Sequence, residues 1–365
     1  GSAYGSTTNP VQLGSGGAGG DGGADGGTGG GLAIFTVTGT TTIDGAITAS
    51  GGTGTLGGSR AGGGGSGGAF NLTTGGLEGT GSVTANGGAG GDNSVDGGGG
   101  GGGRIAIQYT TGSTTNLTLQ AFGGSGAGVA EEGGAGTIFT KSTVQTNGDL
   151  TLNNNDAARS AESVLIGTST FDTLTVASSS NFVVPTSTAL SYTTLNIADN
   201  GILTERGTIN FPSSFTVDAG GEVRFDRGRS FTNLTVNGTV SHSPNTTTQE
   251  YILNLNISGD LTINSGGSID LDEAGYRGGL DELSSGEGPG GGNNNVNDSG
   301  GGGAYGGDGG DSADLVAGGS AYGSTTNPVQ LGSGGAGGDG GADGGTGGGL
   351  AIFTVTGTTT IDGAI

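Results

Sequence analysis

Apolar and polar residues alternate in short runs between residues 174 and 271, as a β-strand with one buried face requires. The runs fall into three rows, and within each row they recur every 17 to 22 residues. Three short strands in each period predict a parallel β-solenoid with three faces, in which successive coils stack their strands. The rows pass through Leu174, Leu195, Phe215, Leu234 and Leu255; through Val183, Leu203, Val223, Val240 and Leu261; and through Leu190, Ile209, Phe231, Ile252 and Ile269.

The same alternation of apolar and polar residues predicts the class of fold. No window repeats apolar residues with helical spacing over three turns, so the sequence predicts no amphipathic helix. A β-sandwich remains an alternative, although it would not require such even spacing. We therefore predict an all-β chain with one continuous hydrophobic interior. The expected interior contains Leu174, Val176, Leu195, Ile197, Phe215, Val217, Leu234, Val236, Leu255 and Ile257.

A longer period continues in the Gly-rich part of the chain. Ala49, Ala85 and Ala121 each follow a short apolar run and lie 36 residues apart. Each coil then carries extra residues at the same corner, and the stretch 276–349 would be the largest such insert. Further strands should open at Leu32, Ala69, Arg104 and Thr137, and in the third of these Ile105, Ile107 and Tyr109 should point inward and Ala106 and Gln108 outward.

The inserts, at roughly 53–66, 89–101 and 125–134, are dominated by glycine. Inserts that leave one corner of successive coils must stack at the strand spacing of about 4.8 Å, where side chains would collide and glycine would not. One interpretation is a Gly-rich flange along the solenoid, in a conformation similar to polyproline II. Flexible glycine loops in solvent are an equal alternative.

Residues 319–365 repeat residues 1–47 without a substitution, at an offset of 318. This identity favours a tandem repeat over a single duplicated segment, so we interpret the chain as one unit and the start of the next, taken from a longer array. Both copies should adopt the same coil conformation. The predicted parts are Gly-rich coils over 1–140, Gly-poor coils over 141–275, a Gly-rich insert over 276–318, and the start of the next repeat over 319–365.

Composition narrows the classes of function. The 365 residues include no Cys, one His, and 32 acidic against 9 basic residues, for a net charge of −23. A chain without Cys forms no disulfide and no thiolate metal site. An acidic surface repels phosphate backbones, so we expect no nucleic-acid partner. No apolar stretch approaches the roughly 20 residues of a membrane helix, so we expect no membrane insertion of this segment.

Two blocks resemble a known group of proteins. The run Leu261–Leu271, which precedes a Gly-rich stretch, and the run Gly101–Ile107 are similar to the Gly-rich right-handed β-helix repeats of giant bacterial surface and secreted proteins, such as haemagglutinin-type and autotransporter adhesins. The resemblance implies a right-handed parallel β-helix and an extracellular, structural or adhesive role. It implies no particular ligand.

Carboxylates suggest one weak metal site. Asp270, Asp272 and Glu273 follow one another closely, and the first two share a face of a strand. An oxygen-rich cluster of this kind can hold Ca²⁺. A solvated acidic edge is the alternative, and we expect no other cofactor.

An enzyme is the second hypothesis, since parallel β-helices also host polysaccharide lyases and glycosidases. Glu222, Arg224, Asp226, Arg227 and Arg229 form a dense mixed-charge patch, and paired carboxylates can hydrolyse a glycoside. An exposed ladder of ion pairs explains the patch equally well. The single histidine, His242, precedes a Ser-Pro pair and is predicted to lie at the surface or in a turn.

These observations favour a structural protein that is not an enzyme: the repeat unit of an extracellular filament or giant cell-surface fibre or adhesin, with units stacked coaxially. The expected partners are identical repeat units, and an adhesive role adds surface glycans or neighbouring cells. The alternative is a carbohydrate-acting lyase or glycosidase of the β-helix type, which would lose activity on substitution of Asp226.

Overall fold

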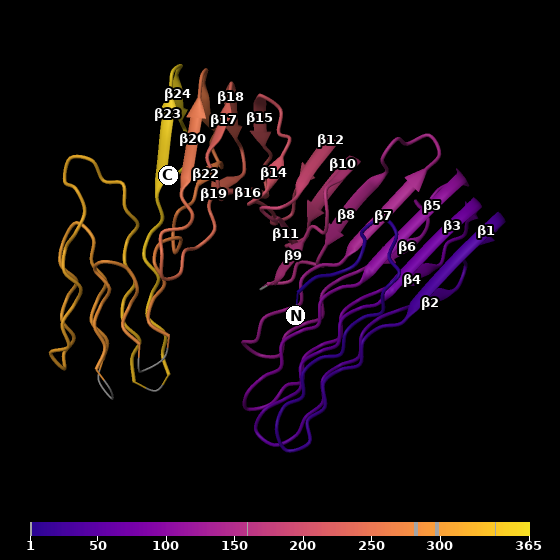
Figure 1. The fold of residues 1–365 in the computed structure, drawn as a ribbon, viewed down its shortest axis with the longest axis horizontal. Coiled ribbons are helices and arrows are strands. Elements are labelled where there is room, and N and C mark those ends of the chain that lie inside the picture. The colour runs from indigo at the N-terminus through magenta and orange to yellow at the C-terminus, as the bar shows by residue number, and fades with distance from the viewer. Residues whose placement is uncertain (1, 159, 281–283, 296–298, 340) are drawn as a thin grey trace. The chain divides into compact units, whose positions relative to one another are not determined.

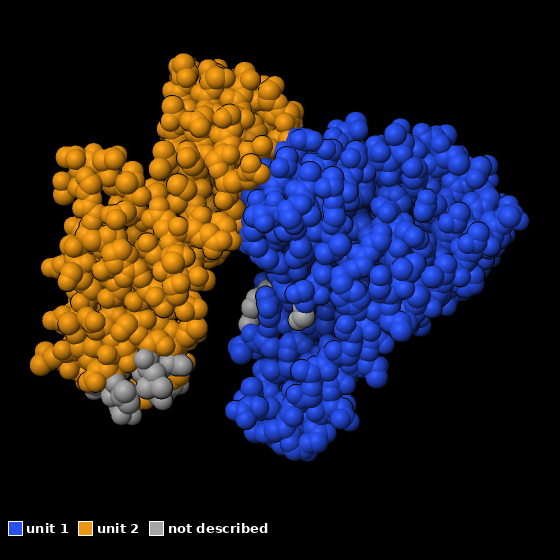
Figure 2. Space-filling model, viewed as in Figure 1, with its two compact units in different colours: residues 1–210, 220–222 blue, residues 211–219, 223–365 orange. Residues whose placement is uncertain are grey.

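The computed structural model describes residues 2–158, 160–280, 284–295, 299–339 and 341–365, and within them the chain forms strands and no helix. It divides into two compact units: residues 1–210 with 220–222, and residues 211–219 with 223–365 (Figure 2). The fold is therefore all-β, as predicted, and most neighbouring strands are parallel (Figure 1). No helix in the described part of the chain is long and apolar enough to cross a membrane.

The first unit begins with four long strands in one parallel sheet. They open at the four predicted residues and are β1 (Leu32–Thr42), β3 (Ala69–Glu78), β5 (Arg104–Gly112) and β7 (Thr137–Ser142). A second parallel sheet consists of β2 (Ala46–Thr48), β4 (Ser82–Thr84) and β6 (Thr118–Gln120). The 36-residue period of the sequence is the spacing of these short strands.

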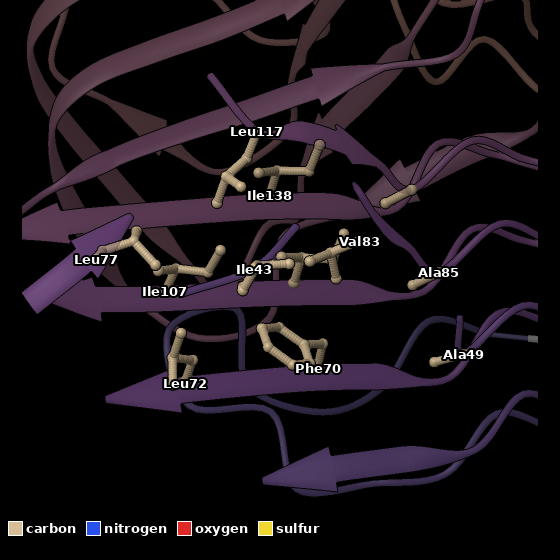
Figure 3. Packing of buried hydrophobic residues seen from close by; sticks show 12 residues of the cluster. Ile43, Ala49, Phe70, Leu72, Leu77, Val83, Ala85, Ile107, Leu117 and Ile138 are labelled. Carbon is tan, nitrogen blue, oxygen red and sulfur yellow. The ribbon is translucent and has the colours of Figure 1, made fainter. Parts of the chain in front are cut away.

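A hydrophobic cluster lies on the inner side of these strands (Figure 3). The alanines that mark the 36-residue period of the sequence belong to this cluster. Ring centroids of Phe35 and Phe70 lie 5.9 Å apart at its edge. The buried members are Ile43, Ala49, Phe70, Leu72, Leu77, Val83, Ala85, Ile105, Ile107, Leu117, Ala121 and Ile138.

The outer face of the long-strand sheet is also covered. Ala106, predicted to point to solvent, is fully buried. Its neighbour on β3 is Asn71, whose side-chain amide donates to Oδ1 of Asn9 at 2.7 Å. Arg104 Nε donates to the carbonyl of Tyr4 at 3.0 Å. The N-terminal segment therefore lies over this face, a contact that periodicity does not reveal.

The strand direction reverses between β7 and β8 (Asp149–Asn153), which pair antiparallel. The prediction of a uniformly parallel solenoid is wrong at this point. Residues 143–148 are too few for a crossover and can connect only antiparallel neighbours. Gly148 supplies a positive φ of 85° at the end of this turn. The reversal coincides with the predicted change from Gly-rich to Gly-poor sequence near residue 140.

The core moves to the opposite face of the sheet at the same place. Ile138 belongs to the cluster of Figure 3. The next residue, Phe139, points the other way and pairs with Leu150 on β8. The rings of Phe139 and Phe171 lie 6.2 Å apart, and Leu150 and Leu174 are fully buried. The Gly-poor strands thus bury their apolar residues on the face that the Gly-rich strands turn outward.

The remaining strands of the first unit continue both a long sheet and a short one. The long sheet adds β10 (Ser169–Ala177), β12 (Ala189–Ile197) and β14 (Thr208–Ile209), all parallel to β8. The short sheet contains β9 (Glu162–Val164), β11 (Asn181–Val184) and β13 (Gly201–Glu205). Leu174 pairs with Leu195 and Leu190 with Ile209, so these parts of the predicted rows are confirmed.

The second unit stacks its strands in three rows. One row contains β17 (Arg229–Phe231), β20 (Leu253–Ile257) and β23 (Ala351–Val355). Another contains β15 (Ser214–Val217), β18 (Asn233–Val236), β21 (Leu261–Ile263) and β24 (Thr359–Ile361). The third contains β16 (Gly221–Phe225), of which residues 223–225 belong to this unit, with β19 (Thr239–Ser241) and β22 (Ser268–Ile269).

The predicted interior residues are buried, apart from half-buried Leu195. Their arrangement in one row is wrong, however, because they belong to different sheets. Leu234 pairs with Leu261 and not with Leu255. Residues 242–252 form an irregular insert at this point. After this insert, each later strand stacks on the row next to the one that the period of the sequence predicts.

The Gly-rich inserts form hydrogen-bonded layers. Amides of Gly14 and Gly17 donate to carbonyls of Gly30 and Gly27 on the returning arm of the same insert. Donors recur every three residues, which is the period of a polyproline II helix. The same spacing joins one layer to the next, in bonds from Gly27 to Gly63, from Gly30 to Ser66, from Gly64 to Gly98 and from Gly67 to Gly101.

The distance between layers explains the choice of glycine. A Cβ on Gly64 would lie 1.9 Å from the carbonyl oxygen of Gly88, and a Cβ on Gly99 would lie 1.9 Å from that of Gly124. A side chain at either of these positions would separate the layers and break their hydrogen bonds. The inserts are thus a stacked flange and not free loops.

Candidate functional site

The Gly-rich part of the segment that occurs twice forms the same hydrogen bonds in both copies. Gly14 donates to Gly30 at 2.9 Å in the first copy, and Gly332 donates to Gly348 at 2.9 Å in the second. The residues of the single strand β1 and the following Ile43 are divided in the second copy between β23 and β24, which belong to different sheets. Because the sequence is identical, these differences between the copies arise from their surroundings.

The two copies pair through opposite edges. In the first copy, Phe35 on β1 pairs with Leu72 on β3, which follows it in the chain. In the second copy the same residue is Phe353 on β23, and it pairs with Leu255 on β20, which precedes it. We call these the downstream and upstream faces of the segment. Each copy forms contacts through the face that is free in the other.

Both sets of pairs involve the same alternate residues of the segment. In-register residues of parallel neighbours point to the same side of a sheet. The same residues of the segment therefore lie in register with buried residues of β20 in the second copy and of β3 in the first, which defines three columns. In each column the middle residue belongs to the segment and is given by its number in the first copy. The columns are Leu253, Ala33 and Phe70; Leu255, Phe35 and Leu72; and Ile257, Val37 and Thr74.

Exposed fractions of the side chains separate the two faces. Leu13 is 62% exposed, but its copy Leu331 is fully buried and packs against Tyr276. Ile43 is 5% exposed, but its copy Ile361 is 50% exposed. Residues 1–47 thus have a free upstream face, and residues 319–365 a free downstream face.

Glycines of the segment show the same division. A Cβ on Gly27 would lie 1.8 Å from the carbonyl oxygen of Gly52, whereas its copy Gly345 has no neighbour within 4 Å. Gly31 has no neighbour within 4 Å, but a Cβ on its copy Gly349 would meet a ring nitrogen at 2.5 Å. Glycine is therefore required on both faces of the segment.

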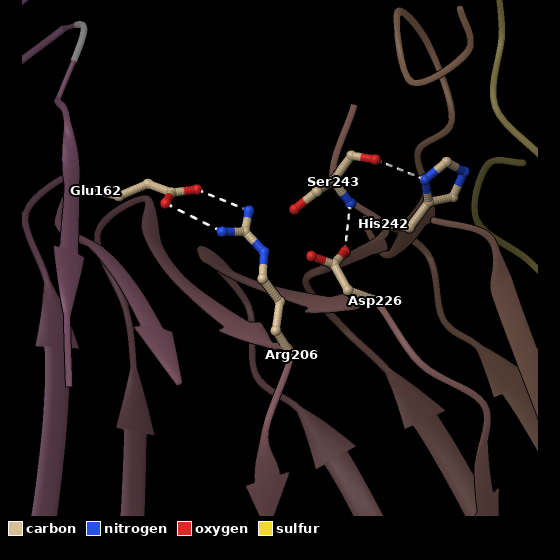
Figure 4. A network of polar contacts seen from close by, with 5 residues as sticks. All are labelled: Glu162, Arg206, Asp226, His242 and Ser243. Atoms are coloured by element: carbon tan, nitrogen blue, oxygen red, sulfur yellow. Dashed lines mark hydrogen bonds and ion pairs between the residues drawn. The ribbon is translucent and has the colours of Figure 1, made fainter. Parts of the chain in front are cut away.

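That ring belongs to His242, which bonds the second copy directly. Its Nδ1 donates to the carbonyl of Ser243 at 2.9 Å (Figure 4), and its Nε2 accepts the amide of Leu350 at 3.1 Å. The ring is neutral in this arrangement, since an imidazolium could not accept. The prediction of a surface histidine is wrong, because Gly349 and Leu350 of the second copy close over a ring that is 2% exposed.

Burial is the main influence on the pKa of His242 and lowers it below the usual 6.5. The hydrogen bond with the Ser243 carbonyl and the charge of Asp226 act in the opposite direction, and Arg224 lowers the pKa further. Asp226 is held in place by the amide of Ser243, at 2.6 Å (Figure 4). The neutral ring is thus maintained by its enclosure.

The calcium candidates Asp270, Asp272 and Glu273 are all exposed. Oδ1 of Asp270 accepts the amide of Asp272 at 3.0 Å. No three His, Cys, Asp or Glu side chains are grouped for metal binding anywhere in the described ranges. Among the described residues, therefore, these carboxylates are exposed to solvent and are not part of a group of three or more potential metal ligands.

Other charged side chains serve local structure. Glu162 forms a two-pronged ion pair with Arg206, with N–O distances of 2.8 and 3.1 Å (Figure 4). The guanidinium of Arg229, in the mixed-charge patch, lies 5.1 Å from the ring centre of Phe211, a cation–π distance.

A groove of about 550 Å³ lies in the first unit, between the N-terminal segment and the Gly layers. Fifteen of its 35 lining residues are glycine, and the others include Tyr4, Arg104 and Glu131. Arg104 is engaged with Tyr4 and with Oγ1 of Thr137, each at 3.0 Å. Its charge is therefore used to hold the N-terminal segment on the sheet.

No family model, curated protein or solved structure matches this chain. Function is therefore inferred from the two faces of the repeated segment. The sequence signals this site through the identity of 47 residues, but gives no indication of which side chains each face buries or that His242 participates.

Proposed function

We propose that this chain is a structural repeat unit of an extracellular filament or of a giant cell-surface fibre or adhesin, in which units stack coaxially. One observation carries the proposal: the repeated segment pairs upstream through Phe353 and Leu255, and downstream through Phe35 and Leu72. Inside an array, each copy would make both sets of contacts at once. The sheets and the hydrophobic core would then continue from one 318-residue repeat to the next without interruption.

We further infer that the coils form a three-faced parallel β-helix. In the second unit, β17, β18 and β19 are followed in register by β20, β21 and β22. At the junction of β7 and β8 the strand direction and the core face change together. Reversing both the strand direction and the buried face is equivalent to rotating the following strands by half a turn about the axis along which the strands stack. A rotation does not change the hand in which the chain winds. A right hand is the rule for parallel crossovers.

The extracellular location rests on the resemblance to giant surface and secreted proteins and on the acidic composition. The repeated segment holds three acidic residues and no basic one, so each 318-residue unit carries a charge of −20. Such a filament is a polyanion that remains soluble. Identical units are its first partners, and surface glycans or neighbouring cells are the partners an adhesive role adds.

The test is electron cryomicroscopy of a tandem array of four 318-residue units. Coaxial stacking gives a continuous rod, with strands about 4.8 Å apart across every junction. The matched control carries Asp in place of Leu13 in every unit, a position that is fully buried in the second copy. The control should break into separate bodies at regular intervals. Separate bodies in the unsubstituted array would refute the proposal.

A further inference from the structure

We propose that His242 is a pH-sensitive contact between the second copy and the coil before it: in mildly acidic solution the ring takes up a proton, its bond to Leu350 breaks, and the pairing of β23 with β20 opens from that end. This inference rests on the proposed coaxial stacking, because an array would contain the contact once in every repeat. It adds a chemical control of the junction between repeats.

Leu350 connects the ring to the sheet. Its amide donates to Nε2 of His242 at 3.1 Å, and its carbonyl accepts the amide of Leu253 at 2.9 Å. The next residue, Ala351, is the first of β23 and pairs with Leu253 on β20. The ring is therefore attached to the point at which the ladder between the two strands begins.

A second proton on the ring is incompatible with this arrangement. Nδ1 already donates to the carbonyl of Ser243, so the added proton must go to Nε2, where it would face the N–H group of Leu350. The ring has little room to move, since it is 2% exposed and a Cβ on Gly349 would lie 2.5 Å from Nε2. The ring can therefore accept the proton only when Leu350 leaves it.

The charged groups around the ring leave this conflict in place. Both ring nitrogens bond to the backbone, and the carboxylate of Asp226 accepts the amide of Ser243. Burial has the largest effect on the pKa of the ring and lowers it; the bond to Ser243 and the charge of Asp226 raise the pKa, and Arg224 lowers it. The insert 242–252 and residues 270–274, which bond to Gly349, carry acidic side chains that are exposed to solvent, and Tyr276 packs against Leu350. These acidic residues are Glu250, Asp270, Asp272 and Glu273.

The position of this residue makes the effect local. His242 is the single histidine among the 365 residues, and histidine is the side chain whose ordinary pKa lies between pH 5 and 8. Mild acid should therefore act at the junction and leave the other coils paired.

Hydrogen exchange of the full chain at about pH 7.5 and about pH 5, resolved to single amides and corrected for intrinsic rates, tests the contact. Each pH unit below about 6.5 should increase the opening at Leu350 about tenfold, until the lowered pKa of the enclosed ring is reached. The amides of Leu350 and Leu253 should thus lose protection by up to about 30-fold, while those of β10 should not change. Equal protection of Leu350 at both pH values would overturn the proposal.

Two charge variants distinguish a titrating ring from one that only fills space. Asp226→Asn retains an oxygen that can accept the amide of Ser243 but removes a charge that raises the pKa of the ring, so the loss of protection should move to lower pH. Arg224→Gln removes a charge that lowers this pKa, so the loss should move to higher pH. Shifts in the same direction, or no shift in either variant, would contradict the proposal.

His242→Gln is the control that does not titrate. Its amide can donate and accept as the neutral ring does, so Leu350 should stay protected at about pH 5. If this variant loses protection with pH as the unsubstituted chain does, another group is responsible and the proposal fails. If Gln does not hold β23 even at about pH 7.5, the opposite shifts of the two charge variants decide the question.

Failure of this inference is separable from failure of the proposed function. A continuous rod in the four-unit array, together with pH-independent exchange at Leu350, would remove only the pH-sensitive contact. Separate bodies in the array, together with pH-dependent exchange at Leu350 in the single chain, would remove only the proposed stacking.

Discussion

Leu13 and Leu331 are the same residue in two copies of one segment, yet the side chain of Leu13 is 62% exposed and that of Leu331 is fully buried against Tyr276. Sequence cannot account for this difference, since the 47 residues are identical. The two copies differ in the strands that stack against them. The chain therefore contains its own control for every residue of the segment.

The first prediction compares truncations on the upstream face. Leu331→Ala should lower the free energy of unfolding by about 2–5 kcal/mol, because it leaves a cavity in a packed site. Leu13→Ala should change it by less than about 0.5 kcal/mol. Urea unfolding of both variants measures the difference. Equal losses would mean that Leu331 does not contribute to docking of the second copy.

The downstream face should reverse this order. Ile43→Ala, at a site that is 5% exposed, should cost about 2–5 kcal/mol, and Ile361→Ala, at a site that is 50% exposed, should cost much less. The same urea titration applies. A larger effect at Ile361 than at Ile43 would contradict the assignment of the two faces.

Glycine substitutions test the flange. Gly27→Ala would place a Cβ 1.8 Å from the carbonyl oxygen of Gly52, so we expect a loss of about 1–3 kcal/mol or more as the layers separate. Gly345→Ala meets no atom within 4 Å and should be neutral or stabilise slightly. Thermal unfolding followed by circular dichroism compares the pair. A harmless Gly27→Ala would show that the layers are not held closely together.

His242 predicts a pH dependence of stability. Its pKa is lowered in the folded chain by burial, so the unfolded chain binds the extra proton first as the pH falls. The stability it contributes is fully present above its unfolded pKa of about 6.5 and declines as the pH falls from there toward the lowered folded pKa. Thermal melts between pH 7.5 and about 5 measure this decline. His242→Gln, which does not titrate, should flatten that part of the profile; an unchanged profile would exclude His242 as its source.

Charge predicts the lateral behaviour of arrays. A charge of −20 per unit keeps neighbouring filaments apart over a screening length of about 10 Å at 0.1 M salt. Raising the salt or adding Mg²⁺ should promote bundling, and a chelator at low salt should reverse the effect of Mg²⁺. Electron microscopy of a multi-unit array would show it. Bundling that persists in chelator at low salt would exclude charge as the main control.

The sequence alone determined the repeat, the class of fold and much of the core. Period-two alternation depends only on side chains that reach opposite faces of a strand, so the openings of β1, β3, β5 and β7 could be read directly. The alanines 36 residues apart reached the interior for the same reason. Each is a local pattern repeated at a fixed period, which needs no knowledge of distant contacts.

Tertiary structure decided what depends on contacts between distant residues. Ala106 is buried because the N-terminal segment covers it, and His242 is buried because Leu350 lies over its ring. The reversal between β7 and β8 depends on a short connection. The sequence does not show it, because the alternation of apolar and polar residues is the same in either strand direction and with either face buried. The segment's two faces are likewise invisible in its sequence, since identical residues become buried or exposed according to the coil that stacks against them.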